Sequence, residues 1–377
     1  MSRVKFGDVV KRININVDRF NTDRLYYIGK GATIEPDALT VEPQGRINAT
    51  LGFKFHFGFN PGHILFMSRC FDQHKAATAT FAGICSDSTY VVETKDESVL
   101  LQRYLQLEMQ SDRFWRWCEE HKSGGVNYLI NYSTLETYEF NLPSLDEQKV
   151  LAEKLWAAYE VKQSYLKMID ATQEMVKAHF YEIVGDTQTN IHHWPIKKLP
   201  EIAEYTIGLT YKPGDVKEDG TIVLRSGNIK ESSIDLEDIV RVGSVIKDSL
   251  YVKVGDILMC SRNGSASLVG KVAQIKEIKE PMTFGAFMTI IRSIYSDYLF
   301  LFFQSNDFRK QISGGKSSTM NQITRYMLDE IVIPFPDNES IEKLSKILYQ
   351  ADKSISELRK SIDAIDKVIK SLINENL

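Results

Sequence analysis

Basic and amide side chains gather in loops of the second half of the chain, in the stretches Leu224–Lys230, Ser261–Ser265 and Ser313–Gln322. These loops contain Gly and Ser, so their backbone can approach another molecule closely. An arginine can donate two hydrogen bonds to one guanine, and Asn or Gln can pair in a similar way with adenine. The residues selected for this chemistry are Arg225, Asn228, Arg262, Asn263, Ser265, Lys316, Ser317, Thr319, Asn321 and Gln322. The matching positions of the first half are Arg69, His74, Lys75, Lys122, Asn127 and Tyr128.

Each of these side chains also has a structural explanation. Arg225 and Arg262 stand at the ends of predicted strands, where they could equally form salt bridges that hold the fold. Asn321 and Gln322 could cap the helix that follows them, and Lys316 could contact a phosphate or only water. The prediction therefore concerns the loops first and the individual side chains second.

The sequence lacks the common motifs of catalysis. It contains no G-x-x-x-x-G-K-[ST] loop, no G-x-G-x-x-G after a strand, no H-E-x-x-H pair and no Asn-Pro-Pro-aromatic tetrapeptide. The segment Glu147–Lys149 resembles the Glu-x-Lys end of a nuclease metal site, but the solvated first turn of a helix explains it as well. We therefore predict a protein without catalytic residues and without a bound metal.

The composition is that of a globular protein. The 377 residues are 43% hydrophobic and 25% charged, which suits two or three domains. No apolar run approaches the roughly 18 residues of a membrane span, and the first residues lack the apolar core of a signal peptide, so we expect a cytoplasmic protein. Cys70, Cys85, Cys118 and Cys260 form no C-x-x-C pair and are expected to be reduced thiols. The net charge of −4 permits a basic face, because steering depends on where charges lie.

The two halves of the chain repeat one another. "NPGHILFMSR" (Asn60–Arg69) returns as "KVGDILMCSR" (Lys253–Arg262), and "QSDRFWRW" (Gln110–Trp117) returns as "QSNDFRKQ" (Gln304–Gln311). "SGG" recurs, and so does an apolar-Pro step followed by an acidic stretch, near Pro143 and again near Pro336. Matches in the same order at a nearly constant offset indicate a tandem duplication.

A long helix is predicted at the end of each half, because apolar residues alternate at spacings of three and four. The first helix is predicted over 146–185, with Lys162 and Thr172 interrupting its seam, and the second over 339–377. The first seam contains Leu151, Leu155, Ala158, Tyr165, Ile169 and Val176. The second seam contains Ile341, Leu344, Leu348, Ala351, Ile355, Leu358, Ile362, Ile365, Ile369 and Leu372.

The predicted architecture follows from the repeat and the helices. We expect an α+β protein with two globular domains, over 1–145 and 186–338, each followed by its long helix. If the helices pair antiparallel as a coiled coil, the duplication gives a pseudo-two-fold internal repeat. The prolines before each helix would stop the preceding strand, and the acidic residues after them suit a helix N-terminus.

The chain resembles the specificity subunits of Type I restriction–modification systems. The residues that carry the resemblance are "LRSGNIK" (Leu224–Lys230), "GLTYKP" (Gly208–Pro213), "VKVGDILMCSRNGSASLVGKVA" (Val252–Ala273) and "SGGKSSTMNQITRYMLDEIVIPFP" (Ser313–Pro336). In the first half, "PGHILFMSR" and "LETYEFNLPSLDEQKVLAEKL" match the same places, so the resemblance covers nearly the whole chain.

This resemblance implies two target-recognition domains, each reading one half of a split double-stranded DNA site. The paired helices would set the unread gap and dock two methyltransferase subunits, which would methylate adenine with S-adenosylmethionine bound on them rather than on this chain. Motor-nuclease subunits would join for restriction, so all catalysis would lie in partners.

Three alternatives remain open at this point. The chain could be a coiled-coil scaffold whose end domains bind protein, which predicts no sequence-dependent DNA affinity. It could be a nuclease with a metal site around Glu147, which predicts Mg²⁺-dependent cleavage lost in Glu147→Ala. It could also read DNA within another methylation-based phage-defence complex.

Overall fold

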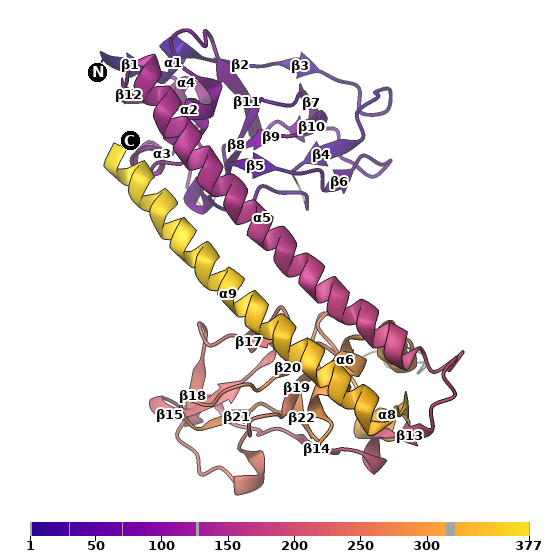
Figure 1. The fold of residues 1–377 in the computed structure, drawn as a ribbon. Helices are drawn as coiled ribbons and strands as arrows, with labels where there is room; N and C mark the ends of the chain where they lie inside the picture. Colours follow the sequence, from indigo (N-terminus) through magenta and orange to yellow (C-terminus); the bar gives the residue numbers. More distant parts are fainter. Residues whose placement is uncertain (1, 30, 70, 126–127, 314–320, 377) are drawn as a thin grey trace. The chain divides into compact units, whose positions relative to one another are not determined.

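The structure is a computed structural model that describes residues 2–29, 31–69, 71–125, 128–313 and 321–376. The chain forms two compact units, the first of residues 1–167 with 358–377 and the second of 168–357. Each unit contains strands, short helices and a section of both long helices, α5 (Leu145–Val184) and α9 (Asn338–Asn376) (Figure 1).

The first unit begins with a strand that pairs with the last strand before α5. Its strands are β1 (Ser2–Lys5), β2 (Val10–Arg12), β3 (Ile15–Asn16), β4 (Tyr26–Ile28), β5 (Thr40–Val41), β6 (Gly45–Arg46), β7 (Phe55–Phe59), β8 (Ile64–Met67), β9 (Ala76–Ala79), β10 (Gly83–Ser86), β11 (Thr89–Thr94) and β12 (Glu139–Leu142). They form the sheets β1-β12, β3-β7-β10-β4-β6 and β2-β11-β8-β9-β5. The short helices are α1 (Phe6–Val9), α2 (Gln102–Glu108), α3 (Asp112–Glu120) and α4 (Tyr132–Leu135).

The second unit contains a shorter version of the same layout. Its strands are β13 (Ile196–Lys198), β14 (Glu204–Ile207), β15 (Val216–Leu224), β16 (Ile229–Lys230), β17 (Ser233–Ile234), β18 (Val240–Val242), β19 (Ile257–Cys260), β20 (Val272–Gln274), β21 (Met282–Phe284), β22 (Met288–Arg292) and β23 (Val332–Pro334). The sheets are β13-β23, β14-β22-β19-β20, β18-β15-β21 and β16-β17. The short helices are α6 (Ser296–Gln304), α7 (Asn306–Ser313) and α8 (Arg325–Asp329).

The strand orders confirm the predicted internal repeat. The order β2-β11-β8-β9 of the first unit corresponds to β14-β22-β19-β20 of the second, with the same antiparallel pairings. In both units a parallel pair, β10 with β4 and β21 with β15, lies beside an antiparallel partner strand. The predicted α+β class is therefore correct.

Local turns and caps also recur at matching positions. The turn before β8 requires Gly62 at φ +91°, and the turn before β19 requires Gly255 at φ +90°, a backbone region that glycine enters without strain. Helix α3 is capped by Ser111, whose hydroxyl accepts from the amide of Phe114 at 3.1 Å. Ser305 accepts in the same way from Phe308 at 3.2 Å at the start of α7.

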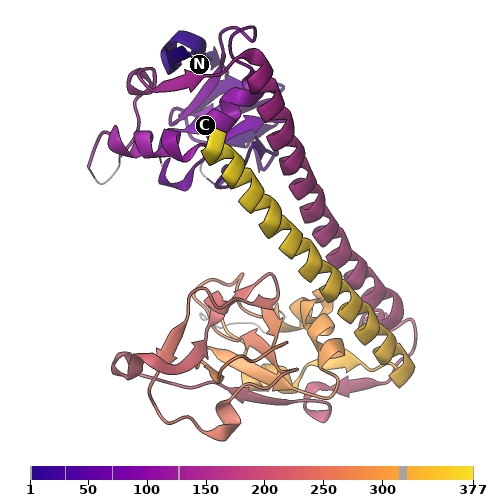
Figure 2. The same cartoon turned by 60° about the vertical axis from the view of Figure 1, so that its left-hand side comes forward.

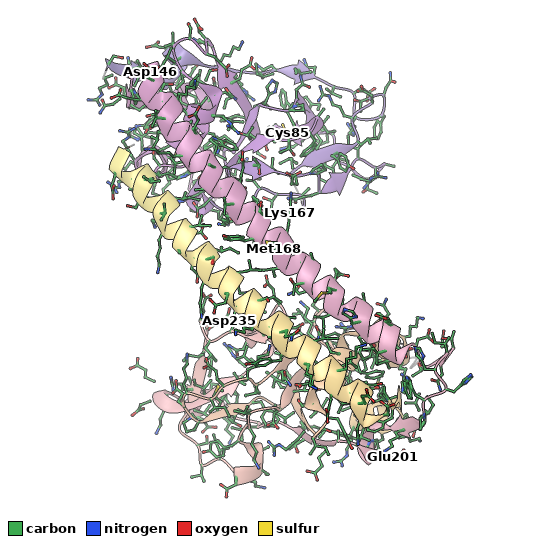
Figure 3. The ribbon with its side chains drawn as sticks, viewed as in Figure 1. Cys85, Asp146, Lys167, Met168, Glu201 and Asp235 are labelled. Carbon is green, nitrogen blue, oxygen red and sulfur yellow. The ribbon has the colours of Figure 1, made fainter. Side chains whose placement is uncertain are left out.

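Both long helices begin one residue before the predicted starts. Ser144 and Glu147 form a reciprocal cap, in which Glu147 accepts from the backbone amide of Ser144 at 2.9 Å and from its hydroxyl at 2.8 Å. Asp337 accepts from the amide of Ser340 at 2.8 Å and so caps α9. Asp146 also lies in the first turn of α5 (Figure 3). The repeated acidic stretch is thus a repeated helix start.

The two long helices run antiparallel, because opposite ends meet within each unit. In the first unit Leu155, Trp156 and Tyr159 of α5 share a core with Ile373 of α9. In the second unit the core contains Val176, Phe180 and Val184 of α5 together with Ile341, Leu344, Leu348 and Ala351 of α9. Both views show α5 and α9 side by side (Figures 1 and 2).

Every predicted seam residue is at least half-buried. The most buried ones, each no more than 9% exposed, are Leu155, Ile169, Val176, Ile341, Leu344, Leu348, Ala351 and Ile362. Lys162, one of the two interruptions of the first seam, forms an ion pair of 2.6 Å with Asp366 of α9. A polar pair within an apolar seam favours one register of the two helices over others.

The cysteines that the structure describes are buried thiols. Cys85, Cys118 and Cys260 are unbridged, and burial raises the pKa of Cys85 to about 12, so it stays protonated (Figure 3). Cys70 lies outside the described residues. Within the part of the chain that the structure describes, no helix is both long and apolar enough to cross a membrane.

Candidate nucleic-acid interface

Three loops that are far apart in the sequence of the second unit meet at one place. The side-chain amide of Asn263 donates to the hydroxyl of Ser226 at 3.0 Å, and that of Asn321 donates to the carbonyl of Gly264 at 3.1 Å. The predicted loops around Arg225, Arg262 and Asn321 are therefore brought together. Their meeting point is called the loop edge below.

Arg262 is an exposed cation of the loop edge whose side chain is held by neighbouring residues. Its Nε and Nη2 atoms donate to Oε1 of Gln322 at 3.1 Å and 2.6 Å. The ring of Phe287, 57% exposed, lies beneath it, with the guanidinium carbon 5.7 Å from the ring centroid. The backbones of Arg262 and Gln322 also form an isolated β-bridge, so strand geometry brings the two side chains together.

A groove of about 510 Å³ opens beside Arg262. Its lining includes Tyr205, Ser261, Thr289, Gln322 and Arg325. The Arg325 guanidinium lies 5.5 Å from the ring centroid of Tyr205. Burial, together with a hydrogen bond to Asp329, raises the pKa of Tyr205 to about 12, so its hydroxyl remains a neutral donor. Two guanidinium groups on a groove suit a phosphate-bearing ligand.

The remaining predicted residues of the second unit differ in availability. Arg225 pairs with Asp238 at 3.1 Å, the structural role that the sequence left open. Asn228 is only 2% exposed, and its side chain binds Arg225, Asp235 and Asp238 within its own loop, so this placement does not support contact with a base. Ser265 is exposed. Lys316, Ser317 and Thr319 lie outside the described residues.

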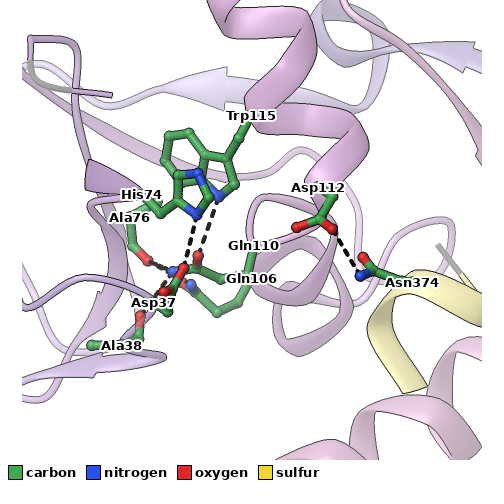
Figure 4. A network of polar contacts seen from close by, with 9 residues as sticks. All are labelled: Asp37, Ala38, His74, Ala76, Gln106, Gln110, Asp112, Trp115 and Asn374. Atoms are coloured by element: carbon green, nitrogen blue, oxygen red, sulfur yellow. Dashed lines mark hydrogen bonds and ion pairs between the residues drawn. The ribbon is translucent and has the colours of Figure 1, made fainter. Parts of the chain in front are cut away.

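Three of the predicted residues of the first unit, Lys122, Tyr128 and His74, make aromatic contacts. Lys122 sits 4.9 Å from the ring centroid of Tyr128 and forms an ion pair with Glu119. The His74 ring stacks on Trp115 with centroids 4.9 Å apart, while its Nδ1 lies 2.9 Å from a carboxylate oxygen of Asp37 (Figure 4).

The other two cations of the first unit sit nearby in the sequence. Lys75 donates to Thr33 at 3.2 Å, and Arg69 is exposed. Asn127 lies outside the described residues.

One backbone hydrogen bond next to Arg262 has a counterpart in the first unit, and this shared arrangement is called the arginine frame below. The amide of Ile130 donates to the carbonyl of Ser68 at 3.0 Å, and the amide of Ile323 donates to the carbonyl of Ser261 at 2.7 Å. Arg69 and Arg262 each follow the serine of this frame directly. Both halves therefore present an arginine on the same turn after β8 or β19.

Each unit has an arginine–tyrosine cation–π pair beside this frame, but the strand and the helix that supply the two residues are swapped between the units. In the first unit Arg12 of β2 lies 5.6 Å from the ring centroid of Tyr132, the first residue of α4. In the second unit the tyrosine, Tyr205, is on β14 and the arginine, Arg325, is the first residue of α8. The sequence interpretation missed Arg12, Tyr205, Phe287 and Arg325. Arg325 stands only three residues after Gln322, so an extension of that loop would have included it.

Gly208 lets the backbone beside the groove pack closely. A Cβ atom on Gly208 would lie 2.3 Å from the carbonyl oxygen of Phe284 and 2.4 Å from that of Gly285. We expect Gly208→Ala to lower the free energy of unfolding by about 1–3 kcal/mol, measured by urea denaturation. Gly214→Ala is the matched control, because nothing lies within 4 Å of its Cβ position. Equal stability of the two variants would contradict the prediction.

The nuclease alternative finds no support in the geometry. Glu147 is occupied by the cap of α5, and hydrogen bonds from the Ser144 backbone and hydroxyl hold its pKa below the usual range. Among the residues that the structure describes, no group of three or more His, Cys, Asp or Glu side chains could hold a metal ion.

Comparison with known proteins finds a match for part of the chain. Residues 192–367 match the family model of the Type I restriction modification DNA specificity domain. Over this part of its length the chain is similar to the specificity subunits of Type I restriction enzymes. These matches confirm the resemblance stated from the sequence.

The relatives are similar over part of their length. The specificity subunit of the Type I restriction enzyme EcoKI from Escherichia coli K12 is 30% identical over 43% of this chain and 37% of the relative. The StySPI specificity subunit of Salmonella potsdam is 29% identical over 44% of this chain and 38% of the relative. The chain thus spans less than two-fifths of these two curated relatives. The S subunit of a Type I restriction–modification system from M. genitalium has the same fold, with a TM-score of 0.53 at 14% identity, covering 99% of this chain and 94% of that one.

Proposed function

We propose that each unit reads one half of a split site on double-stranded DNA. The observation that carries this proposal is the arginine frame, because Arg69 and Arg262 occupy the same turn of two units with the same strand order. The second unit contains residues 192–357 of the match to the DNA specificity domain, and the first unit repeats its frame. Two similar readers in one chain suit two half-sites on a duplex.

We further propose that α5 and α9 set the unread gap and dock two methyltransferase subunits. An apolar stripe of α5 supports docking of a partner helix: Val150, Val161, Met168 and Met175 are 51%, 43%, 53% and 45% exposed. The alanines at 157 and 171 continue this stripe at heptad spacing. Adenine methylation, with S-adenosylmethionine on the methyltransferase, and cleavage by motor-nuclease subunits would belong to these partners, so the chain itself would catalyse nothing.

The experiment is a genome-wide map of N6-methyladenine in cells that express this chain with the methyltransferase encoded beside it. The expected result is a split motif with a fixed gap that is absent without the chain. Arg262→Ala with Arg325→Ala should alter only one half of the motif and leave the other half unchanged.

The other outcomes separate the alternatives. Methylation that depends on the chain but lacks a split motif would retain DNA targeting and exclude two readers. Methylation that is indifferent to the chain would favour the protein-binding scaffold. A nuclease that copurifies with the complex distinguishes restriction from a methylation-only defence system.

A further inference from the structure

The two units differ in how they hold the arginine of the shared frame. In the second unit Gln322 precedes Ile323 and accepts two hydrogen bonds from Arg262. In the first unit the residue before Ile130 is Leu129, whose side chain has no hydrogen-bond acceptor.

The residue beneath the arginine also differs. The carbonyl of Phe287 accepts from the amide of Ser261 at 2.9 Å, and the carbonyl of Ser88 accepts from Ser68 at the same distance. These bonds place Ser88 where the second unit has Phe287. The second unit therefore supplies an acceptor and an aromatic ring to its arginine, and the first unit supplies an aliphatic side chain and a hydroxyl at those positions.

This difference decides what each arginine can recognise. A flexible arginine follows the nearest phosphate, which gives affinity but no sequence information. An arginine whose guanidinium plane is fixed before binding has lost most of its rotamer freedom already, and its planar fork then matches the O6 and N7 atoms of guanine better than any other base edge.

We propose that Gln322 is a positioning residue that makes Arg262 the reader of one guanine in the second half-site, whereas Arg69 contributes affinity without base discrimination. The inference rests on the proposed function, because it presumes that both units bind DNA. Specificity at one base pair then comes from Arg262 and Gln322 of the second unit. The arginine at the matching position of the first unit, Arg69, contacts the phosphate backbone.

The test is selection of bound sites from a random duplex library by the full chain in its methyltransferase complex. Wild type should select guanine at one position of the second half-site, and Arg262→Ala should lose that preference. Gln322→Leu, which installs the residue of the first unit, should relax the same base pair by about 10- to 100-fold, a larger change than its loss of affinity for random DNA. Gln322→Glu retains an acceptor and should keep the guanine preference, although its charge lowers overall affinity.

Arg69→Ala is the matched control, and it should weaken all sites equally and change no base preference. Full retention of the guanine preference in Gln322→Leu overturns the positioning role. Loss of a base preference in Arg69→Ala overturns the contrast between the units. If Gln322→Leu and Gln322→Glu lose the preference together, orientation of Arg262 is not the cause. A wild-type complex that selects no motif would instead reject the proposed function, so the two failures are distinguishable.

Discussion

Replacement of Arg113 by methionine is expected to lower the free energy of unfolding by about 3 kcal/mol at pH 7. Arg113 donates to both carboxylate oxygens of Glu108 at 2.8 Å, and Glu108 has no exposed surface. The Tyr138 hydroxyl donates to the same carboxylate at 2.5 Å. Removal of the cation leaves a buried charge without its partner. The expected loss lies at the lower end of the range for buried pairs, because the Arg113 side chain is 37% exposed.

The loss in this variant should depend on pH in a defined direction. Burial raises the pKa of Glu108, while Arg113 and Tyr138 oppose that rise. Without Arg113 the pKa in the folded state rises further above its unfolded value near 4.5. A carboxyl whose folded pKa is raised favours folding when protonated, so the stability of the variant falls as pH increases through this window. Urea unfolding, followed by tryptophan fluorescence, should therefore show a smaller deficit at pH 5 than at pH 8.

The double variant Glu108→Gln, Arg113→Met is the control for charge. A buried neutral amide costs less than a buried carboxylate, so the double variant should be more stable than Arg113→Met alone at pH 8. A double variant that is as unstable as the single one would assign the loss to the packing of the Arg113 stem and reject the electrostatic explanation.

The long helices could be predicted because their signal is local. The alternation of apolar residues over Leu151–Val176 and Ile341–Leu372 fixes the faces that pack, and the acidic residues that follow Pro143 and Pro336 fix the starts. Loops were also predictable as regions, since Gly and Ser mark them.

The partners of individual loop residues were not predictable, because they come from distant segments. Arg262 illustrates this limit, since the acceptor of its hydrogen bonds, Gln322, lies 60 positions further along the chain. Matching the two halves residue by residue also could not detect ion pairs in which the acidic and basic residues have exchanged positions. His63 and Glu93 of the first unit lie 3.4 Å apart, while the corresponding turn and strand of the second unit carry Asp256 and Arg292 at 2.6 Å. The interaction is retained while both residue types change, so residue-by-residue matching finds no similarity there.

The second large effect is expected from Gln148→Ile, which should lower the free energy of unfolding by about 3 kcal/mol. Gln148 is fully buried in the first turns of α5. Its side-chain nitrogen donates to the carbonyls of Val99 and Pro143, both at 3.0 Å, and its oxygen accepts from the amide of Leu101 at 2.9 Å. An isoleucine would remove these three hydrogen bonds, of which the one to Pro143 is buried and the other two are part-buried.

The second unit provides the matched comparison, because Ile341 occupies the same place relative to its proline and is only 7% exposed. The start of each long helix therefore suits its own residue. Ile341→Gln should also destabilise the protein, since it buries an amide in an apolar core. Hydrogen exchange measured by mass spectrometry should locate the two effects differently. Gln148→Ile should speed exchange over residues 99–108, whereas Ile341→Gln should speed it around the start of α9. Unchanged exchange at Leu101 in Gln148→Ile would show that this glutamine does not stabilise the contact between the start of α5 and the segment around Leu101.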